Sequence, residues 1–223
     1  RTYALGSGRW RPVMFNHTTF TTMAACIGVL SEKCIEADTV LDADVLRYKF
    51  AFEHGGVYHD DDARLLARPS EWPARYPTLD WKKATLVVGV EFPRPRGVGP
   101  SGCCLQFVQW GFAAARGSRI LHETATRAKA NANRGAIADA VALTGPVLFT
   151  NIILKHLGHV FNLSDVEEHG ALYSTIYGEN VIVLPYRAFG IHPQHQNVNT
   201  LPSEQQLMRH SFLGRWRHSA ATR

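Results

Sequence analysis

The pattern of apolar and polar positions predicts helices that alternate with strands. Residues 43–53 favour a helix, because helix-forming residues there follow an N-cap candidate, Asp42, and precede a C-cap candidate, Gly55. Residues 57–59 are typical of a short strand. The nearly continuous apolar run 84–92 is typical of a strand that is buried on both faces of a sheet.

The second half of the chain continues this alternation. Glycines and prolines crowd residues 93–102, which predicts an exposed loop. We expect helices over 105–115, 120–132 and 147–156, and a last buried strand over 181–184. These elements indicate an α/β domain with a mostly parallel central sheet flanked by helices. Ligands of such sheets usually bind at the carboxyl ends of strands.

Composition narrows the fold class and the partners. The chain has 223 residues, of which 45% are apolar and 19% are charged, so it is neither a disordered nor a collagen-like sequence. We expect one domain over 1–223 with a sizeable core. The formal charge of +5 suits an anionic ligand, but the basic residues are scattered, so no nucleic-acid partner is expected. The longest apolar runs, 23–30 and 84–90, are shorter than the ~20 residues that span a bilayer.

Other sequence features bear on the cellular compartment. The chain begins at Arg1 rather than at Met, and we expect a fragment from which any N-terminal targeting segment is absent. Asn-x-Ser/Thr triplets at Asn16 and Asn162 permit N-glycosylation of a lumenal protein. The cysteines have neither a CxxC spacing nor a His-rich partner cluster, so no zinc site is expected and their pairing stays open. They are Cys26, Cys34, Cys103 and Cys104.

An acidic triplet follows the first predicted strand. Because side chains alternate along a strand, Asp60 and Asp62 are expected on the same side, where their carboxylates repel each other unless a cation lies between them. Hard divalent cations such as Mn²⁺ or Mg²⁺ prefer such oxygen ligands and share them with substrate phosphates. A solvated acidic turn is the alternative. The apolar strand and the two glycines before the triplet favour a metal site.

A polar stripe lies on the first predicted helix. Asp44, Arg47, Tyr48 and Ala51 are spaced i, i+3, i+4 and i+7, hence on one face of a helix that is otherwise largely apolar. A buried charge needs a partner. One interpretation is an internal Asp44–Arg47 pair with Tyr48 in the core. The other is a polar pocket in which Asp44 accepts hydrogen bonds from sugar hydroxyls and Arg47 faces oxygen-rich groups.

An ordered series of sequence blocks carries a resemblance to a known family. The first blocks are Asp44-x-x-Arg47-Tyr48, Gly55-Gly56-Val57-Tyr58 and Asp60-x-Asp62. Further blocks follow in order: Val88-Gly89-Val90-Glu91, Leu105-Gln106-Phe107-x-Gln109-Trp110, Thr144-Gly145-Pro146, Val183-Leu184-Pro185 and His210-x-Phe212-x-Gly214-x-Trp216. This series resembles glycosyltransferase family 32 over residues 43–217. Residues 1–42 do not match the family's first strand.

The resemblance implies a fold, a reaction and a location. The family has a GT-A fold of Rossmann type and transfers a sugar from a nucleotide sugar with retention of anomeric configuration. The chain is similar to the α-1,6-mannosyltransferase branch of the fungal Golgi, which implies GDP-mannose as donor, a glycan acceptor, Mn²⁺ as cofactor and a role in protein N-glycosylation. It also implies a lumenal catalytic domain, a membrane anchor upstream of Arg1 and a Golgi mannosyltransferase complex.

The same resemblance implies roles for individual residues. Asp60 and Asp62 are expected to hold the metal against the donor diphosphate, with His210 as a third ligand. Donor binding is expected of Asp44, Arg47, Tyr48, Gly55, Gly56, Tyr58 and Asp60, and a catalytic role of Asp44, Asp60 and Asp62. Contacts with the acceptor or a sugar are expected of Glu91, Trp110 and Trp216, although core packing also explains the tryptophans and a salt bridge also explains Glu91.

Two positions depart from the mannosyltransferase pattern, and other functions stay open. Arg215 replaces a small Ser, and Asn151 replaces an acidic residue. The alternatives are an inositol phosphorylceramide mannosyltransferase, a non-catalytic lumenal relative and a metal-dependent phosphoester hydrolase. A hydrolase leaves the polar helix stripe and the C-terminal block unexplained. The blocks at 105–110 and at Trp216 favour the N-glycan enzyme over the sphingolipid enzyme.

Overall fold

A computed structural model describes residues 40–93, 105–133, 140–186, 188–189 and 203–211. In chain order the helices are α2 (Val40–His54), α3 (Trp72–Arg75), α4 (Arg119–Ala132), α5 (Ala140–Leu143) and α6 (Pro146–Leu157). The strands are β1 (Gly56–His59), β2 (Ala63–Leu65), β3 (Leu86–Pro93), β4 (Leu105–Phe107), β5 (Gly111–Ala114), β6 (Ala171–Ser174), β7 (Asn180–Leu184) and β8 (Met208–His210). Short 3₁₀ turns lie at Pro69–Glu71, Gly158–Val160, Leu163–Asp165 and Ser203–Gln205.

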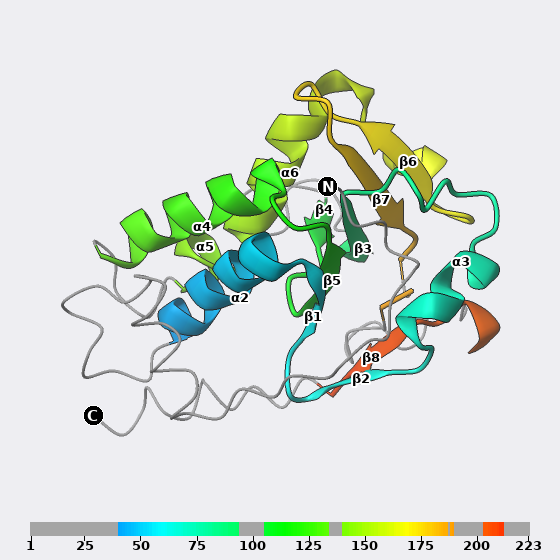
Figure 1. Ribbon diagram of the computed structural model, residues 1–223, viewed down its shortest axis with the longest axis horizontal. Helices are drawn as coiled ribbons and strands as arrows, with labels where there is room; N and C mark the ends of the chain where they lie inside the picture. Colours follow the sequence, from blue (N-terminus) through cyan, green and yellow to red (C-terminus); the bar gives the residue numbers. More distant parts are fainter. Residues whose placement is uncertain (1–39, 94–104, 134–139, 187, 190–202, 212–223) are drawn as a thin grey trace.

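A six-stranded sheet forms the centre of the molecule (Figure 1). Its strands are ordered β1-β5-β3-β7-β6, and β4 pairs with β3 beside this path. The α/β class with a central sheet flanked by helices is confirmed. The mostly parallel order needs correction, because in the described residues only β3 and β7 pair in parallel and the other ladders are antiparallel. Antiparallel neighbours can be joined by short connections, as β6 and β7 are.

The expected helix over 105–115 is wrong. These residues form β4 and β5, which pair with β3, and β5 also pairs with β1. Short apolar runs fit a buried strand as well as a buried helix, and here both strands complete the central sheet. The other helices and strands expected within the described residues are confirmed, whereas the expected loop over 94–102 lies outside them.

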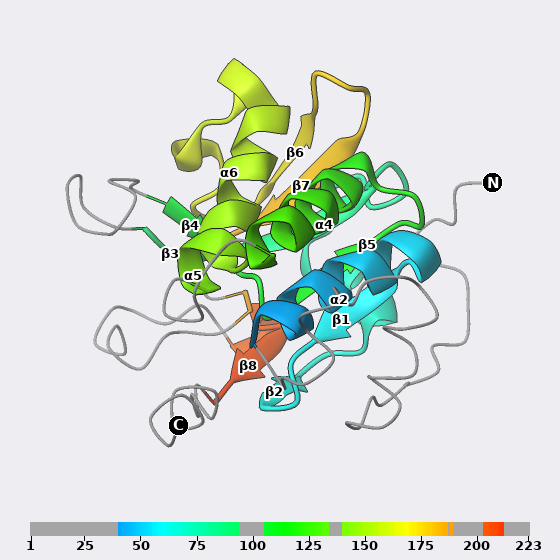
Figure 2. The same cartoon turned by 90° about the vertical axis from the view of Figure 1, so that its left-hand side faces the viewer.

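The two faces of the sheet bury different layers. Side chains alternate along β3, so Leu86 and Val88 pack on one face and Val87 packs on the other. Helices α2, α4 and α6 cover the first face, as both views show (Figure 2). The second face is covered by aromatic residues around α3, including Trp72, and by the small sheet of β2 and β8.

Residues Ala140–Val160 are long and apolar enough to cross a membrane by length and composition alone. In the structure this stretch is α5 and α6, and side chains of α6 such as Phe149, Ile153 and Leu157 are fully buried against the sheet. Its apolar composition therefore has an explanation within the core.

The small sheet places the C-terminal part of the described chain, β8, next to the end of β1. Strands β2 and β8 are antiparallel, with Ala63 opposite His210 and Leu65 opposite Met208. The main-chain N–H of Leu207 donates to the carbonyl of Ala188 at 2.7 Å, which joins this sheet to the segment after β7. As a result, His210 lies beside the turn that contains the acidic triplet.

Candidate metal-binding and donor site

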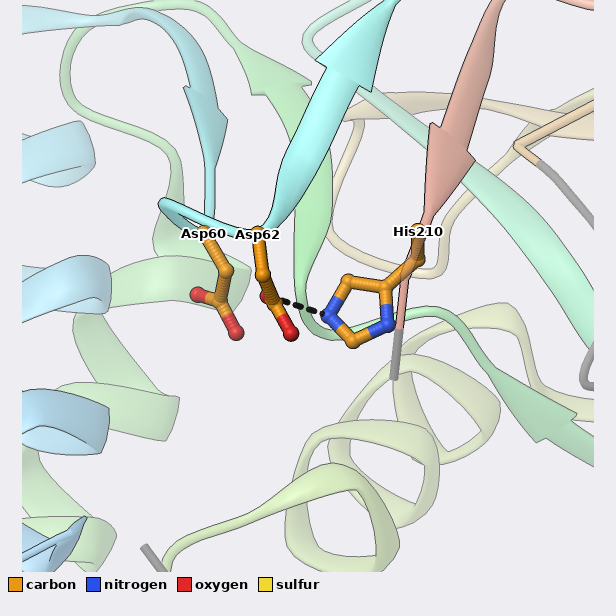
Figure 3. A group of neighbouring side chains, drawn as sticks. All are labelled: Asp60, Asp62 and His210. Carbon is orange, nitrogen blue, oxygen red and sulfur yellow. Dashed lines mark ion pairs between the residues drawn. The ribbon is translucent and has the colours of Figure 1, made fainter. Parts of the chain in front are cut away.

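Three predicted ligands come together where β1 ends (Figure 3). Asp60 directly follows β1, Asp62 directly precedes β2, and His210 is the last residue of β8. Each offers one ligand atom, and these atoms lie within 4.8 Å of one another. Asp62 Oδ1 is 2.8 Å from His210 Nε2. Two carboxylates from one turn and one imidazole from β8 therefore lie close together.

Main-chain hydrogen bonds fix the turn that presents both aspartates. The N–H of Asp60 donates to the carbonyl of Trp110 at 2.9 Å, and the N–H of Ala63 donates to the carbonyl of Asp60 at 3.0 Å. The N–H of Ser211 donates to the carbonyl of Asp62 at 2.9 Å. Both sheets therefore hold the turn, which restricts where its carboxylates can point.

The carboxylate of Asp60 is oriented by two side chains. Its Oδ1 accepts hydrogen bonds from Arg47 Nη1 at 2.9 Å and from the Tyr58 hydroxyl at 2.6 Å. Burial raises the pKa of Tyr58 well above its usual range, so the hydroxyl stays protonated and donates. Among the described residues, nothing donates to Oδ2 of Asp60. That oxygen is available to a cation.

Arg47 joins this carboxylate to a second, deeper one. Its Nη2 lies 3.0 Å from Asp44 Oδ1. Asp44 also accepts hydrogen bonds from Gln109 Nε2 at 2.7 Å and Thr144 Oγ1 at 2.8 Å. Asp44 is 3% exposed and Arg47 is 6% exposed, so the internal pair that the helix stripe suggested is present.

Burial shifts the protonation of this pair in a definite direction. Desolvation raises the pKa of Asp44, and its donors Arg47, Gln109 and Thr144 counteract that rise. Burial opposes the charge of Arg47, but the nearby carboxylates, Asp60 foremost, outweigh it and raise the pKa of Arg47. The guanidinium is therefore a permanent cation between two acidic groups.

The surroundings of His210 favour its neutral form on balance. Desolvation lowers its pKa, although Asp62 and Asp60 act in the opposite direction. A neutral imidazole has a lone pair to offer, and carboxylate oxygens with one imidazole nitrogen suit Mn²⁺. The indole of Trp110 stacks on the His210 ring at 4.6 Å between centroids and 28° between planes. The donor set therefore fits the expected divalent cation.

Several predicted donor residues lie around this centre, and others lie away from it. Tyr48 is fully buried, accepts a hydrogen bond from Gln109 Nε2 at 2.8 Å and donates to the carbonyl of Thr144 at 3.0 Å. Gly55 and Gly56 lie at the opposite end of β1 from Asp60, roughly 13 Å along the strand at ~3.3 Å per residue.

The expected acceptor residues are also separated in the structure. Trp110 is in the site, in contact with His210. Glu91 is buried on β3 and accepts a hydrogen bond from Gln106 of the neighbouring β4. Trp216 and the departure at Arg215 lie outside the described residues, and Asn151 is exposed on α6.

Sequence reasoning missed the partners of Asp44. Gln109 and Thr144 are both buried, and both donate to its carboxylate. They are part of the quoted sequence blocks, but no role was expected for them. The polar side chain of Gln109 could have indicated its role, because it interrupts an apolar run and a buried amide needs hydrogen-bond partners.

Comparisons with known proteins give two relatives with the same name. The chain is 26% identical over 209 residues to the initiation-specific alpha-1,6-mannosyltransferase of Candida albicans, covering 80% of this chain and 54% of the relative. It is 28% identical over 193 residues to the enzyme of that name from Schizosaccharomyces pombe, covering 80% of this chain and 47% of the relative. The chain thus spans about half the length of these relatives. No family model matches it.

Proposed function

We propose that the chain is the catalytic part of a retaining glycosyltransferase that moves mannose from GDP-mannose to a glycan acceptor in α-1,6 linkage during protein N-glycosylation. The observation that carries this proposal is the convergence of Asp60, Asp62 and His210 within 4.8 Å. The two relatives named initiation-specific alpha-1,6-mannosyltransferase support the sugar and the linkage. A Golgi location, an upstream membrane anchor and partners in a mannosyltransferase complex belong to the same proposal.

Asp60, Asp62 and His210 would hold Mn²⁺ or a similar divalent cation. When bound, the cation offsets the negative charge that collects on the departing diphosphate. Arg47 and Tyr58 occupy Oδ1 of Asp60 and thereby fix the direction of its other oxygen. These hydrogen bonds orient the carboxylate before the substrate binds, so less reorganisation is needed during the reaction.

We propose that the donor sugar binds on the side of the site that is formed by Arg47 and Asp44. Arg47 reaches from Asp44 to Asp60, so its guanidinium would lie close to a diphosphate held by a cation on Asp60. Asp44 would set the position of Arg47. It would also accept a hydrogen bond from a sugar hydroxyl if that hydroxyl replaced one of its protein donors. From the core, the Tyr48 hydroxyl accepts a hydrogen bond from Gln109, which also donates to Asp44. Gly55 and Gly56 shape the start of β1. Glu91, Trp110 and Trp216 remain proposed acceptor or sugar contacts.

Retention of configuration is proposed to follow a front-face substitution. The departing phosphate oxygen accepts the proton of the attacking hydroxyl while the new glycosidic bond forms on the face that the diphosphate leaves. No carboxylate nucleophile is required, so the geometry of paired carboxylates in retaining glycosidases does not apply. A glycosyl group trapped covalently on Asp44 or Asp61 would contradict this mechanism.

A donor screen tests the function directly. The chain is incubated with GDP-mannose, UDP-glucose or UDP-galactose and an α-mannoside acceptor, with Mn²⁺ or with a chelator, and the product linkage is determined by NMR. We expect mannose transfer that depends on the metal, and a loss of at least ~100-fold in rate when Asp60 and Asp62 are replaced by Asn. Asp61→Asn is the matched control, because Asp61 lies in the same turn but is exposed, and it should retain the activity.

The outcomes separate the alternatives. Transfer that persists fully in chelator contradicts the proposal. Binding of GDP-mannose without transfer to any acceptor supports a non-catalytic relative, and transfer only to inositol phosphorylceramide supports the sphingolipid enzyme. Release of phosphate from a simple phosphoester, without sugar transfer, supports the hydrolase.

A further inference from the structure

Trp110 touches both halves of the cation site. It lies between β4 and β5 of the central sheet and is 6% exposed. Its carbonyl oxygen accepts the hydrogen bond from the N–H of Asp60 at 2.9 Å. Its indole stacks on the imidazole of His210 at 4.6 Å. One residue therefore contacts ligands from both sheets, one through its backbone and one through its ring.

This double contact matters because the ligands belong to separate sheets. Asp60 follows β1 of the central sheet, whereas His210 belongs to β8 of the small sheet. Pairing of Ala63 with His210 sets the position of the β8 backbone, whereas the direction of the imidazole also depends on its side-chain torsion angles and on the groups that the ring contacts. The indole lies against one face of the imidazole, and Asp62 Oδ1 lies 2.8 Å from its Nε2.

The residue after Trp110 shows independently that β8 is seated closely on this segment. A Cβ added to Gly111 would lie 2.9 Å from Sδ of Met208, which is fully buried. Only glycine lets the β8 side chain approach β5 so closely without displacement. Trp110 and Gly111 together thus form the surface against which β8 and its histidine are placed.

We propose that Trp110 is a positioning residue, whose indole fixes the imidazole of His210 in the direction needed to complete the cation site. This inference rests on the proposed function, because it assigns to the three ligands the divalent cation proposed there. It gives Trp110 a different task from the sugar contact expected from the sequence. Groups that orient metal ligands without touching the metal typically change affinity by about 10- to 100-fold.

The test measures Mn²⁺ binding by the whole chain, using the EPR signal of free Mn²⁺, rather than activity. Trp110→Leu removes the aromatic face and is expected to raise the Mn²⁺ dissociation constant about tenfold. Trp110→Phe restores a stacking ring and should remain within about threefold of the wild type. Trp72→Leu is the matched control, because Trp72 is 2% exposed in the same apolar cluster but contacts Phe189, at a tilt of 52° between ring planes, rather than a proposed ligand.

A second readout is independent of the metal and of a general loss of stability. The indole ring current should shift the ring protons of His210 upfield in the metal-free protein, and Trp110→Leu should abolish this shift at a temperature where circular dichroism shows the variant folded. If the wild type binds Mn²⁺ and folded Trp110→Leu binds it with the same affinity, the inference is overturned but the proposed function is not. Equal weakening by Trp72→Leu also overturns it. A wild type that binds no Mn²⁺ overturns the proposed function together with the inference.

Discussion

Arg47 shows how one side chain determines the state of its neighbours. Its guanidinium lies 3.0 Å from Asp44 and 2.9 Å from Asp60, and it is 5.0 Å from the centroid of the Tyr58 ring. Two carboxylates that would repel each other are held in one cluster because this cation lies between them. The cluster still carries more acidic than basic groups when Asp62 is added, which favours a further cation.

Replacement of Arg47 by Met should destabilise the fold as well as the site. Asp44 would remain buried without its cationic partner, and removal of one member of a buried pair costs about 3 kcal/mol. The free energy of unfolding in urea measures this loss. Lys49→Met on the same helix is the control. Its ion pair with Glu53 is 3.6 Å long and partly exposed, so a loss of under ~0.5 kcal/mol is expected. Equal losses in both variants would refute the argument.

At the residue scale, the sequence predicted the grouping of the three candidate ligands better than the hydrogen-bond network around them. Two aspartates one residue apart after a strand indicate a shared side, and the structure places Asp60 and Asp62 together with His210. The spacing of Asp44 and Arg47 indicated a common helix face, and they form an ion pair. Gln109 and Thr144 could not be assigned to Asp44, because hydrogen bonds between residues distant in the sequence depend on tertiary packing.

The junction of α2 and β1 shows how a turn sets the direction of the strand that leads to the site. Gly55 ends the helix with φ +68°, and its N–H donates to the carbonyl of Ala51 at 2.9 Å. A Cβ added there would lie 2.7 Å from the backbone nitrogen of Arg116. The junction therefore needs glycine both for its backbone angle and for the close approach of the segment after β5.

Gly55→Ala should be more destabilising than an alanine at another positive-φ glycine. We expect a loss of about 2–3 kcal/mol, because backbone strain adds to a clash with main-chain atoms that cannot move aside easily. Gly117→Ala is the matched control, since its φ is +83° but no non-neighbouring atom of the described residues lies within 4 Å of the added Cβ, so only about 1 kcal/mol is expected. Thermal unfolding of both variants gives the comparison. A similar loss at both positions would show that steric contact at Gly55 is unimportant.

An ion cluster between α4 and α6 predicts how stability depends on acid. Glu123 lies 2.8 Å from Lys155 Nζ and from Arg127 Nη2, and 2.9 Å from His156 Nε2. Burial acts against its ionisation, but the hydrogen bonds with Lys155 and His156 outweigh burial and lower the pKa of Glu123 to about 2. Because the folded-state pKa is below the ordinary value of 4.5, the stabilisation is complete above pH 4.5.

This stabilisation should disappear as the pH falls from about 4.5 to about 2. Glu123→Gln should remove this part of the pH dependence and lower stability at neutral pH by roughly 1 kcal/mol, a value reduced for solvent screening. Urea unfolding at a series of pH values measures both effects. Glu168→Gln is the control, because that side chain is 86% exposed. A Glu123→Gln curve that parallels the wild type throughout this range would contradict the assignment.

At the element scale, the periodicity of apolar residues was sufficient to predict a helix or strand where its burial follows a regular pattern. The amphipathic and apolar segments that became α2, α4, α6, β3 and β7 were all expected from the sequence. Residues 105–115 were not, since the apolar residues there fit a helix and a strand alike. The choice depends on pairing with β3, and for β5 also with β1. The sheet order depends on the same long-range pairing.

At the scale of the whole molecule, cation binding should stabilise the folded chain. A ligand that binds only the native state adds about 2.7 kcal/mol at 100 times its dissociation constant. For a chain of this size we expect a rise in melting temperature of roughly 5–10 °C with Mn²⁺. Differential scanning fluorimetry measures the shift, and a chelator should reverse it. The shift should be lost in the double variant Asp60→Asn, His210→Ala, and an undiminished shift there would place the cation elsewhere.

The position of β8 has a consequence for how the protein is made. Asp60 and Asp62 leave the ribosome long before His210, so a nascent chain cannot complete the proposed ligand set until β8 has been translated and has paired with β2. Contacts between such distant parts of a chain form late because of the entropy of closing the intervening loop. A product terminated before Met208 therefore keeps the acidic turn but lacks the strand that covers it, and we expect chaperones and proteases to recognise the apolar surface left bare.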